Sequence, residues 1–143
     1  MLETILKNEK FVTLMGGHCF EVLKRLQEEK VEFSVVANMQ FVKFDPELPE
    51  ELSLKNNPFV MFALAGYTFE SMELNKDRLY FHAGFGADDF ATYVSVDLGA
   101  ITQIQIENSV IFVNFSIYKG KTDEENVKNS KNIFLKNNKD LFK

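Results

Sequence analysis

The sequence contains no tryptophan, a single cysteine, only three prolines and no long hydrophobic run. One cysteine, Cys19, forms no disulfide within the chain, which excludes a disulfide-stapled miniprotein and favours a reducing, cytoplasmic location. No window comes close to about 18 uninterrupted apolar residues, so neither a membrane-spanning helix nor a membrane partner is expected. Residues 1–10 carry four charged side chains and lack the apolar core of a signal peptide, so none is expected.

The composition is instead that of a folded domain rich in phenylalanine. Of the 143 residues, 45% are hydrophobic and 15 are phenylalanine, which suits one domain and excludes a wholly disordered chain. The net charge of −5 is spread unevenly: residues 1–118 hold nine basic and seventeen acidic side chains, whereas residues 119–143 hold seven lysines and four acids. An acidic body argues against nucleic-acid binding, because that binding depends on neutralising phosphates.

The charged end, residues 119–143, is predicted to be a separate segment. Its composition is typical of a solvated tail, or of a segment that contacts an acidic partner surface. Thr122 and Glu125 match a helix capping box, and apolar residues then recur at seven-residue spacing. Two interpretations stay open: a helix that docks through an apolar seam, and a tail with apolar anchors.

An amphipathic helix is predicted at residues 18–29. Phe20, Leu23 and Leu26 recur at three-residue steps, which places them on one helical face, and charged residues occupy most positions around them. Two consecutive glycines at residues 16–17 are expected to end whatever element precedes this helix.

Beyond residue 31 the sequence changes to short β-like stretches separated by turn residues. Residues 59–64 form a near-continuous apolar run, typical of a strand buried on both faces. Alternation and turn signals predict further strands near residues 33–37, 67–74, 79–85, 93–98, 101–106 and 110–118. Because helices are not interleaved with these strands, the predicted fold class is α+β, mainly β with an N-terminal helix, arranged as an antiparallel sandwich or small barrel.

No catalytic constellation is apparent in the sequence. The neighbours His18 and Cys19 point about 100° apart on a helix, so they form no nucleophile–base pair, and Cys19 is expected to be a small buried thiol. Two histidines and one cysteine show no zinc-like spacing. Asp88 and Asp89 follow the glycines of residues 84–86, which is typical of a polar turn rather than a cation loop. We therefore expect a binding module without catalytic, metal or cofactor sites, not an enzyme.

One segment carries a resemblance to a known family. Residues 71–86 resemble a central stretch of the SspB family, stringent starvation protein B. The matching positions are Met72, Glu73, Leu74, Asp77, Leu79, Phe81, Ala83, Phe85 and Gly86. Residues 93–101 are similar to a second segment of that family, and the predicted helix at residues 18–29 precedes both in the same order. The resemblance extends over residues 18–118.

The resemblance implies an Sm-like β-fold with an N-terminal helix that forms a homodimer. SspB is a non-enzymatic adaptor that grips the ssrA degradation tag in a groove and tethers the tagged protein to the ClpX unfoldase of the ClpXP protease. Such a tether raises the effective concentration of substrate near ClpX without any chemistry in the adaptor. Residues 1–118 are then expected to form the peptide-binding domain, and residues 119–143 its charged tail or helix.

The resemblance also implies roles for individual residues. The peptide groove would involve Ala65, Tyr80, His82 and Phe85, with Tyr80 and His82 exposed and Phe85 lining the groove from the core side. The dimer contact would come from the helix, through Phe20, Leu23 and Leu26. The tail would dock on ClpX through Leu141, Phe142 and Lys143.

The sequence departs from the family at the proposed groove. Tyr67, Tyr80 and Gly84 stand where the family has arginine, and Gly66 stands where it has proline. Two alternatives therefore stay open. In one, an SspB-like fold serves another client as a dimeric interaction protein. In the other, a pocket near His82 and the two consecutive aspartates binds a small molecule.

Overall fold

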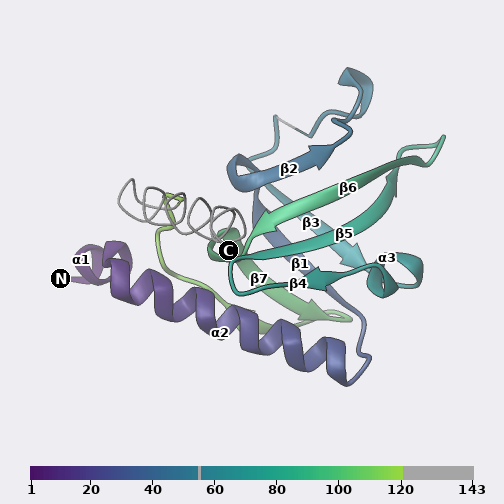
Figure 1. Ribbon diagram of the computed structural model, residues 1–143. Coiled ribbons are helices and arrows are strands. Elements are labelled where there is room, and N and C mark those ends of the chain that lie inside the picture. Colours follow the sequence, from purple (N-terminus) through teal and green to yellow (C-terminus); the bar gives the residue numbers. More distant parts are fainter. Residues whose placement is uncertain (55, 121–143) are drawn as a thin grey trace, which may run out of the picture.

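The computed structural model describes residues 1–54 and 56–120 and is an α+β fold in which strands dominate (Figure 1). Two helices, α1 (Leu2–Lys7) and α2 (Glu9–Glu28), precede all the described strands. The strands form two four-stranded antiparallel sheets, and α2 runs along one side of them. The predicted α+β class is confirmed, but the two sheets close into no barrel within the described residues. None of the helices described has both the length and the hydrophobicity needed to cross a membrane.

Helix α2 is longer than predicted because it continues through the two glycines of residues 16–17. The expectation that these glycines end an element was wrong. The Asn8 side chain caps the helix by accepting a hydrogen bond from the Phe11 N–H at 3.0 Å. Glycine costs a helix about 1 kcal/mol per residue. Burial of Cys19 and Leu23 on the inner face of α2 offsets that cost, because tertiary packing outweighs local propensity.

Sheet A is built around β1, which pairs with β3 on one side and β7 on the other. Its strands in spatial order are β3 (Phe59–Leu64), β1 (Phe33–Asn38), β7 (Ile101–Ile106) and β8 (Ser109–Val113). Phe33, Val35 and Ala37 of β1 point inward and are buried, whereas the residues between them face outward. Strands β3 and β8 therefore form the two edges of this sheet.

Sheet B is built around the hairpin of β5 and β6, which are paired along their whole length. Its strands in spatial order are β2 (Val42–Asp45), β6 (Phe90–Asp97), β5 (Arg78–Phe85) and β4 (Glu73–Leu74). The predicted polar turn joins β5 to β6, with Gly86 at φ 77° and Asp89 at φ 53°. Four single-turn helices complete the fold: η1 (Met39–Phe41), η2 (Glu50–Leu52), α3 (Tyr67–Glu70) and η3 (Leu98–Ala100).

The hydrophobic core lies between the sheets and is closed by α2. Leu23 has no accessible surface and Leu26 is 8% exposed, because the inner face of α2 packs against η3 and β4 of its own chain. The sequence-based assignment of Leu23 and Leu26 to a dimer contact is therefore wrong. Their regular apolar spacing marks the face that α2 buries within the chain. Phe20, the third residue of that set, is only partly buried and packs at the margin of the core.

Three predicted strands differ from the structure, the first in its burial, the second in its type and the third in its length. Residues 59–64 do form β3, but Phe59 and Met61 are 53% and 52% exposed, because an edge strand of an uncovered sheet leaves one face to solvent. The predicted strand at 67–74 begins instead with the helical turn α3, and only Glu73 and Leu74 are paired as a strand. Gly66, at φ 56°, turns the chain, and Phe69 of α3 then packs edge-on against Phe33.

The last predicted strand ends earlier than expected. Strand β8 stops at Val113 rather than near Tyr118, and the last described backbone bond to sheet A is the one that the Asn114 N–H donates to the Thr102 carbonyl at 2.8 Å. The Ile117 N–H donates to the Leu6 carbonyl at 2.7 Å, and the Tyr118 hydroxyl donates to the Asp97 carboxylate at 2.8 Å. Ile117 and Tyr118 are therefore tied to α1 and to the end of β6.

Candidate functional site

Of the four residues predicted to form a peptide groove, three lie at the surface and one points toward the core. Ala65 is exposed and directly follows β3. Tyr80 and His82 are half-buried on the outer face of β5, opposite to the buried side chain of Phe81. Phe85 points inward, where its ring meets the ring of Phe62 at a centroid distance of 6.3 Å. Ala65, Tyr80 and His82 are thus open to the surface, whereas Phe85 faces the core side of β5.

His82 is the centre of an exposed aromatic cluster. Its ring centroid lies 4.5 Å from that of Tyr93 and 5.6 Å from that of Tyr67. The His82 Nδ1 and the Tyr67 hydroxyl are in hydrogen-bond contact at 3.2 Å. Tyr67 and Tyr93 are 65% and 64% exposed. We call Tyr67, His82 and Tyr93 the aromatic surface.

The elements that carry the aromatic surface are fixed to one another by backbone contacts. His82 and Tyr93 are directly opposite on β5 and β6. The Ser71 hydroxyl accepts a hydrogen bond from the His82 N–H at 2.9 Å and donates one to the Thr68 carbonyl at 2.7 Å, which ties α3 to β5. Tyr67 is therefore held beside His82 by the fold, so the surface exists before any ligand arrives.

The aromatic surface adjoins the free edge of sheet A. Strand β3 pairs only with β1 among the described residues, which leaves the backbone groups on its other side without a strand partner. Ala65 continues β3, and Tyr67 follows two residues later at the start of α3. An extended peptide that pairs with an edge strand uses such backbone groups for affinity and nearby pockets for specificity.

Sequence reasoning missed two residues of the site, Tyr67 and Tyr93. A usable signal was present for Tyr93: a tight turn at residues 86–89 sets the register of the β5–β6 hairpin and places Tyr93 opposite His82. For Tyr67 the signal was its place in the resemblance, where the family has arginine at the groove, but its position beside His82 depends on α3, where the sequence predicts a strand.

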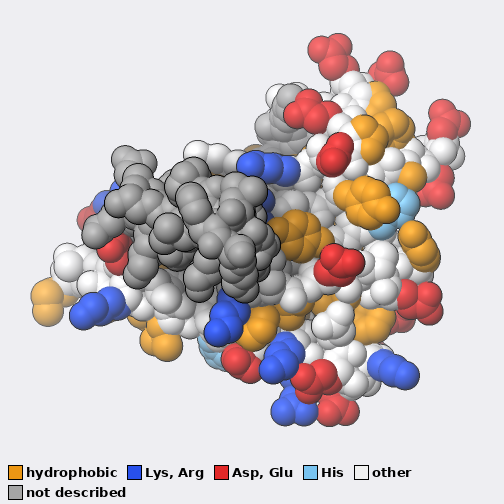
Figure 2. Space-filling view, in the orientation of Figure 1, with side chains coloured by type: hydrophobic (Ala, Val, Ile, Leu, Met, Phe, Trp, Pro, Cys, Tyr) orange, Lys and Arg blue, Asp and Glu red, His pale blue; other side chains and the backbone are white. Residues whose placement is uncertain are grey.

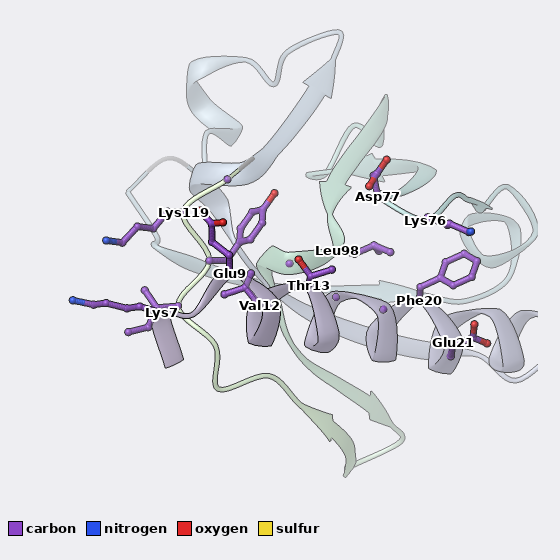
Figure 3. Close-up of a pocket in the computed structure, with 16 residues that line it drawn as sticks. Lys7, Glu9, Val12, Thr13, Phe20, Glu21, Lys76, Asp77, Leu98 and Lys119 are labelled. Atoms are coloured by element: carbon purple, nitrogen blue, oxygen red, sulfur yellow. The ribbon is translucent and has the colours of Figure 1, made fainter. Parts of the chain in front are cut away.

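A hollow lies elsewhere on the molecule, between α2, η3 and the segment from Ile117 to Gly120 (Figure 3). It encloses about 690 Å³, and its walls carry both lysines and acids. Lys7 and Lys119 lie at one end of this hollow and Phe20 near the other. Of the residues given a binding or dimer role from the sequence, only Phe20 lines it, and none of the aromatic surface does, so this hollow is separate from the aromatic surface.

The pair His18 and Cys19 does not form a reactive centre. Cys19 is fully buried, as predicted, and burial raises the pKa of its thiol to about 12. His18 is exposed and its ring lies edge-on to Phe112, with centroids 5.1 Å apart. Within residues 1–54 and 56–120, no three histidine, cysteine or acidic side chains are grouped in a way that would hold a metal ion.

The tail residues predicted to contact ClpX, Leu141, Phe142 and Lys143, lie outside the described residues. So does the whole of residues 121–143, including the apolar positions at seven-residue spacing. The expected division of the chain after residue 118 therefore stays a prediction.

Comparison with known proteins adds no family to these observations. A scan against protein-family models and a search of curated proteins both found no match to the chain. The resemblance to SspB therefore rests on the residues quoted above, and the function has to be argued from the geometry of the site.

Proposed function

We propose that this chain is a non-enzymatic adaptor of the SspB type, which binds ssrA-type degradation tags and delivers tagged proteins to the ClpXP protease. The observation that supports it best is the aromatic surface beside Ala65, at the end of β3, which pairs only with β1 among the described residues. In this proposal the tag pairs with the edge of β3, and its side chains lie over Tyr67 and Tyr93. Exposed tyrosine rings suit such contacts, because they offer a large apolar face with a polar tip.

Small side chains at the end of β3 support the same proposal. Ala65 is exposed and has only a methyl group, so a peptide backbone can approach closely. Apart from its two chain neighbours, no described residue has an atom within 4 Å of the position that a Cβ on Gly66 would occupy. The route from the β3 edge to the aromatic surface is therefore open.

The finer fold and assembly belong to the proposal as well. An N-terminal helix followed by two antiparallel sheets agrees with the element order that an Sm-like SspB fold requires. A homodimer through α2 would use the partly exposed Phe20 at the margin of the core, since Leu23 and Leu26 are interior. Delivery would use a ClpX contact at Leu141, Phe142 and Lys143, in a cytoplasmic setting.

The direct test is fluorescence anisotropy of a labelled ssrA-tag peptide titrated with the full chain. We expect saturable binding, and we expect Tyr67→Ala and Tyr93→Ala each to weaken it about tenfold, which corresponds to about 1.4 kcal/mol. Phe115→Ala is the matched control. Phe115 is a similarly exposed aromatic residue, 70% exposed, and it follows β8 at the opposite edge of sheet A. Absence of binding up to about 100 μM, an affinity of only about 5.5 kcal/mol, would refute the tag-binding role.

A second candidate function, a dimeric interaction protein with another client, is favoured by the other edge of sheet A. Val110, Ile111 and Phe115 are exposed on or just after β8, and no charged residue occurs from Val110 to Tyr118. Natural edge strands usually carry charged residues that prevent pairing with the edge strand of another chain. Light scattering should then show a dimer that Ile111→Lys converts to a monomer. A wild-type chain that is monomeric at micromolar concentration would exclude this candidate.

A further inference from the structure

The aromatic surface lies on a sheet face whose neighbouring positions are set by strand register. The outward residues of β5 are Arg78, Tyr80, His82 and Gly84, and their partners on β6 are Asp97, Ser95, Tyr93 and Ala91. Strand β2 places Asp45 beside Tyr93 and Lys43 beside Ser95. Strand β4 places Glu73 beside Tyr80. Directly opposed residues of antiparallel strands lie close enough for their side chains to interact.

The hairpin turn adds one more carboxylate to this face. A Cβ on Gly84 would point outward like the side chains of Tyr80 and His82, and it would lie only 1.8 Å from an oxygen of Asp89. The Asp89 carboxylate therefore covers Gly84, the next outward position after His82. Glycine at residue 84 leaves the room that this carboxylate occupies.

Acidic groups outnumber basic groups around the aromatic surface. The outward face carries four carboxylates, of Asp45, Glu73, Asp89 and Asp97, and two cations, of Lys43 and Arg78, for a net charge of −2. Asp97 and Arg78 neutralise each other in an ion pair of 3.3 Å. The other three carboxylates form no ion pair within the described residues and face a single lysine. Figure 2 shows acidic side chains around the hydrophobic side chains and histidine on this side of the molecule.

Charge and aromatic rings together select one kind of partner. The face of an exposed tyrosine ring attracts a lysine or arginine side chain, and neighbouring carboxylates strengthen that attraction. We propose that the peptide bound at this surface is cationic, with a lysine or arginine side chain over Tyr93 near the carboxylates of Asp45 and Asp89. This inference rests on the proposed peptide-binding function and names the charge of its substrate. The same carboxylates would repel an acidic peptide.

Three labelled peptides of equal length test the charge preference. They share the same apolar residues and carry lysine, glutamine or glutamate at the same positions, and each is titrated with the full chain by fluorescence anisotropy. We expect the lysine peptide to bind at least tenfold more tightly than the glutamate peptide, with the glutamine peptide between them. The difference should shrink when salt rises from about 0.05 M to about 0.5 M, because screening weakens exposed charge contacts.

Two isosteric variants identify the carboxylates that read the charge. Asp45→Asn and Asp89→Asn should each raise the dissociation constant of the lysine peptide severalfold and leave that of the glutamine peptide unchanged. Glu107→Gln is the matched control for Asp89→Asn: both residues lie in hairpin turns at positive φ, 56° and 53°, but Glu107 joins β7 to β8 on the other sheet. The control should bind all three peptides as the wild type does.

The outcomes separate this inference from the function on which it rests. Equal binding of the three peptides, or a preference for the glutamate peptide, overturns the cationic substrate and leaves peptide binding in place. An equal loss of affinity for all three peptides in Asp45→Asn and Asp89→Asn also overturns it, because the carboxylates would then not distinguish the charge of the peptide. Failure to bind any peptide, ssrA-tag peptide included, overturns both proposals.

Discussion

Burial of the single thiol gives the chain a pH-dependent stability at alkaline pH. Burial raises the pKa of Cys19 from 9.0 to about 12, so above pH 9.0 the unfolded chain holds fewer protons than the folded one. The contribution of Cys19 is complete below pH 9.0 and is lost progressively up to about pH 12. We expect the free energy of unfolding to fall by about 1.4 kcal/mol per pH unit in this window. Urea unfolding at a series of pH values measures the slope.

Cys19→Ala is the control for this slope, because it removes the titrating group. The Tyr118 pKa is also raised, first by burial and then by the hydrogen bond that its hydroxyl donates to Asp97. Tyrosine contributes only above its ordinary pKa of about 10, so the comparison is made between about pH 8 and about pH 10. A slope that is the same in Cys19→Ala and wild type would show that the thiol is not the cause.

Single residues could be predicted where strand alternation decides their direction. Tyr80 and His82 were expected on the face opposite Phe81, and the structure places them there, because the period of a strand is two residues. Leu23 and Leu26 were predicted on the correct face of a helix, but they were assigned to a contact with a second copy instead of to the core of their own chain. Periodicity shows which side of a helix is apolar, but it does not show whether the same chain or another copy covers that side.

Helix α2 keeps two glycines at a position where alanine would fit. Among the described residues, and apart from the chain neighbours and the nearby backbone of α2 itself, no atom lies within 4 Å of a Cβ built on Gly16 or Gly17, and neither residue has a positive φ. Alanine loses less backbone freedom than glycine on folding, by about 0.5–1 kcal/mol at each position. The double variant Gly16→Ala/Gly17→Ala should therefore raise the free energy of unfolding by about 1–2 kcal/mol, measured by urea denaturation.

Gly99→Ala provides the matched comparison within the same region. A Cβ on Gly99 would lie 2.3 Å from the Tyr118 ring, so this variant should displace the ring and lower stability. Equal effects of the two substitutions would contradict the open space assigned to residues 16 and 17.

Elements were predicted well where local pattern and tertiary context agree. The polar turn after Phe85 and the strands on either side of it were expected, because glycines and aspartates separate two β-like stretches. The predictions for the two glycines in α2 and for residues 67–74 were wrong for the same reason. In both segments a few residues carried the local signal, and packing of Cys19 and Phe69 on distant parts of the chain decided the outcome.

The proposed adaptor divides its tasks between the sheets and the tail. A chain ending at Gly120 keeps the aromatic surface and the β3 edge, so we expect it to bind the ssrA-tag peptide as the full chain does. It should fail to accelerate degradation of an ssrA-tagged reporter by ClpXP, because the substrate is no longer held near the unfoldase. Degradation rates with full-length and shortened chains measure the difference.

A second variant keeps the length and charge of the tail. Leu141→Ala/Phe142→Ala in the full chain should reduce delivery while leaving peptide binding unchanged. Normal delivery by both variants would show that residues 121–143 do not act as the tether.

The fold class of the whole molecule followed from element order, but its division into two sheets did not. A helix followed by strands without interleaved helices is enough to indicate an α+β protein. The assignment of β1 to the same sheet as β7, and of β2 to the other sheet, depends on contacts between residues far apart in sequence. No local pattern encodes such pairing, so the open arrangement of the sheets had to come from the structure.

The pairing of β1 with β7 also sets the order in which the protein can be made. Ser34 lies opposite Gln105, a separation of 71 positions, whereas the β5–β6 hairpin joins neighbours in sequence. At a synthesis rate of roughly 5–20 residues per second, several seconds pass after β1 is made before the ribosome has made β7, its partner on that side. We therefore expect the hairpin to form early and sheet A to be completed late, with one edge of β1 exposed to other nascent chains in the interval.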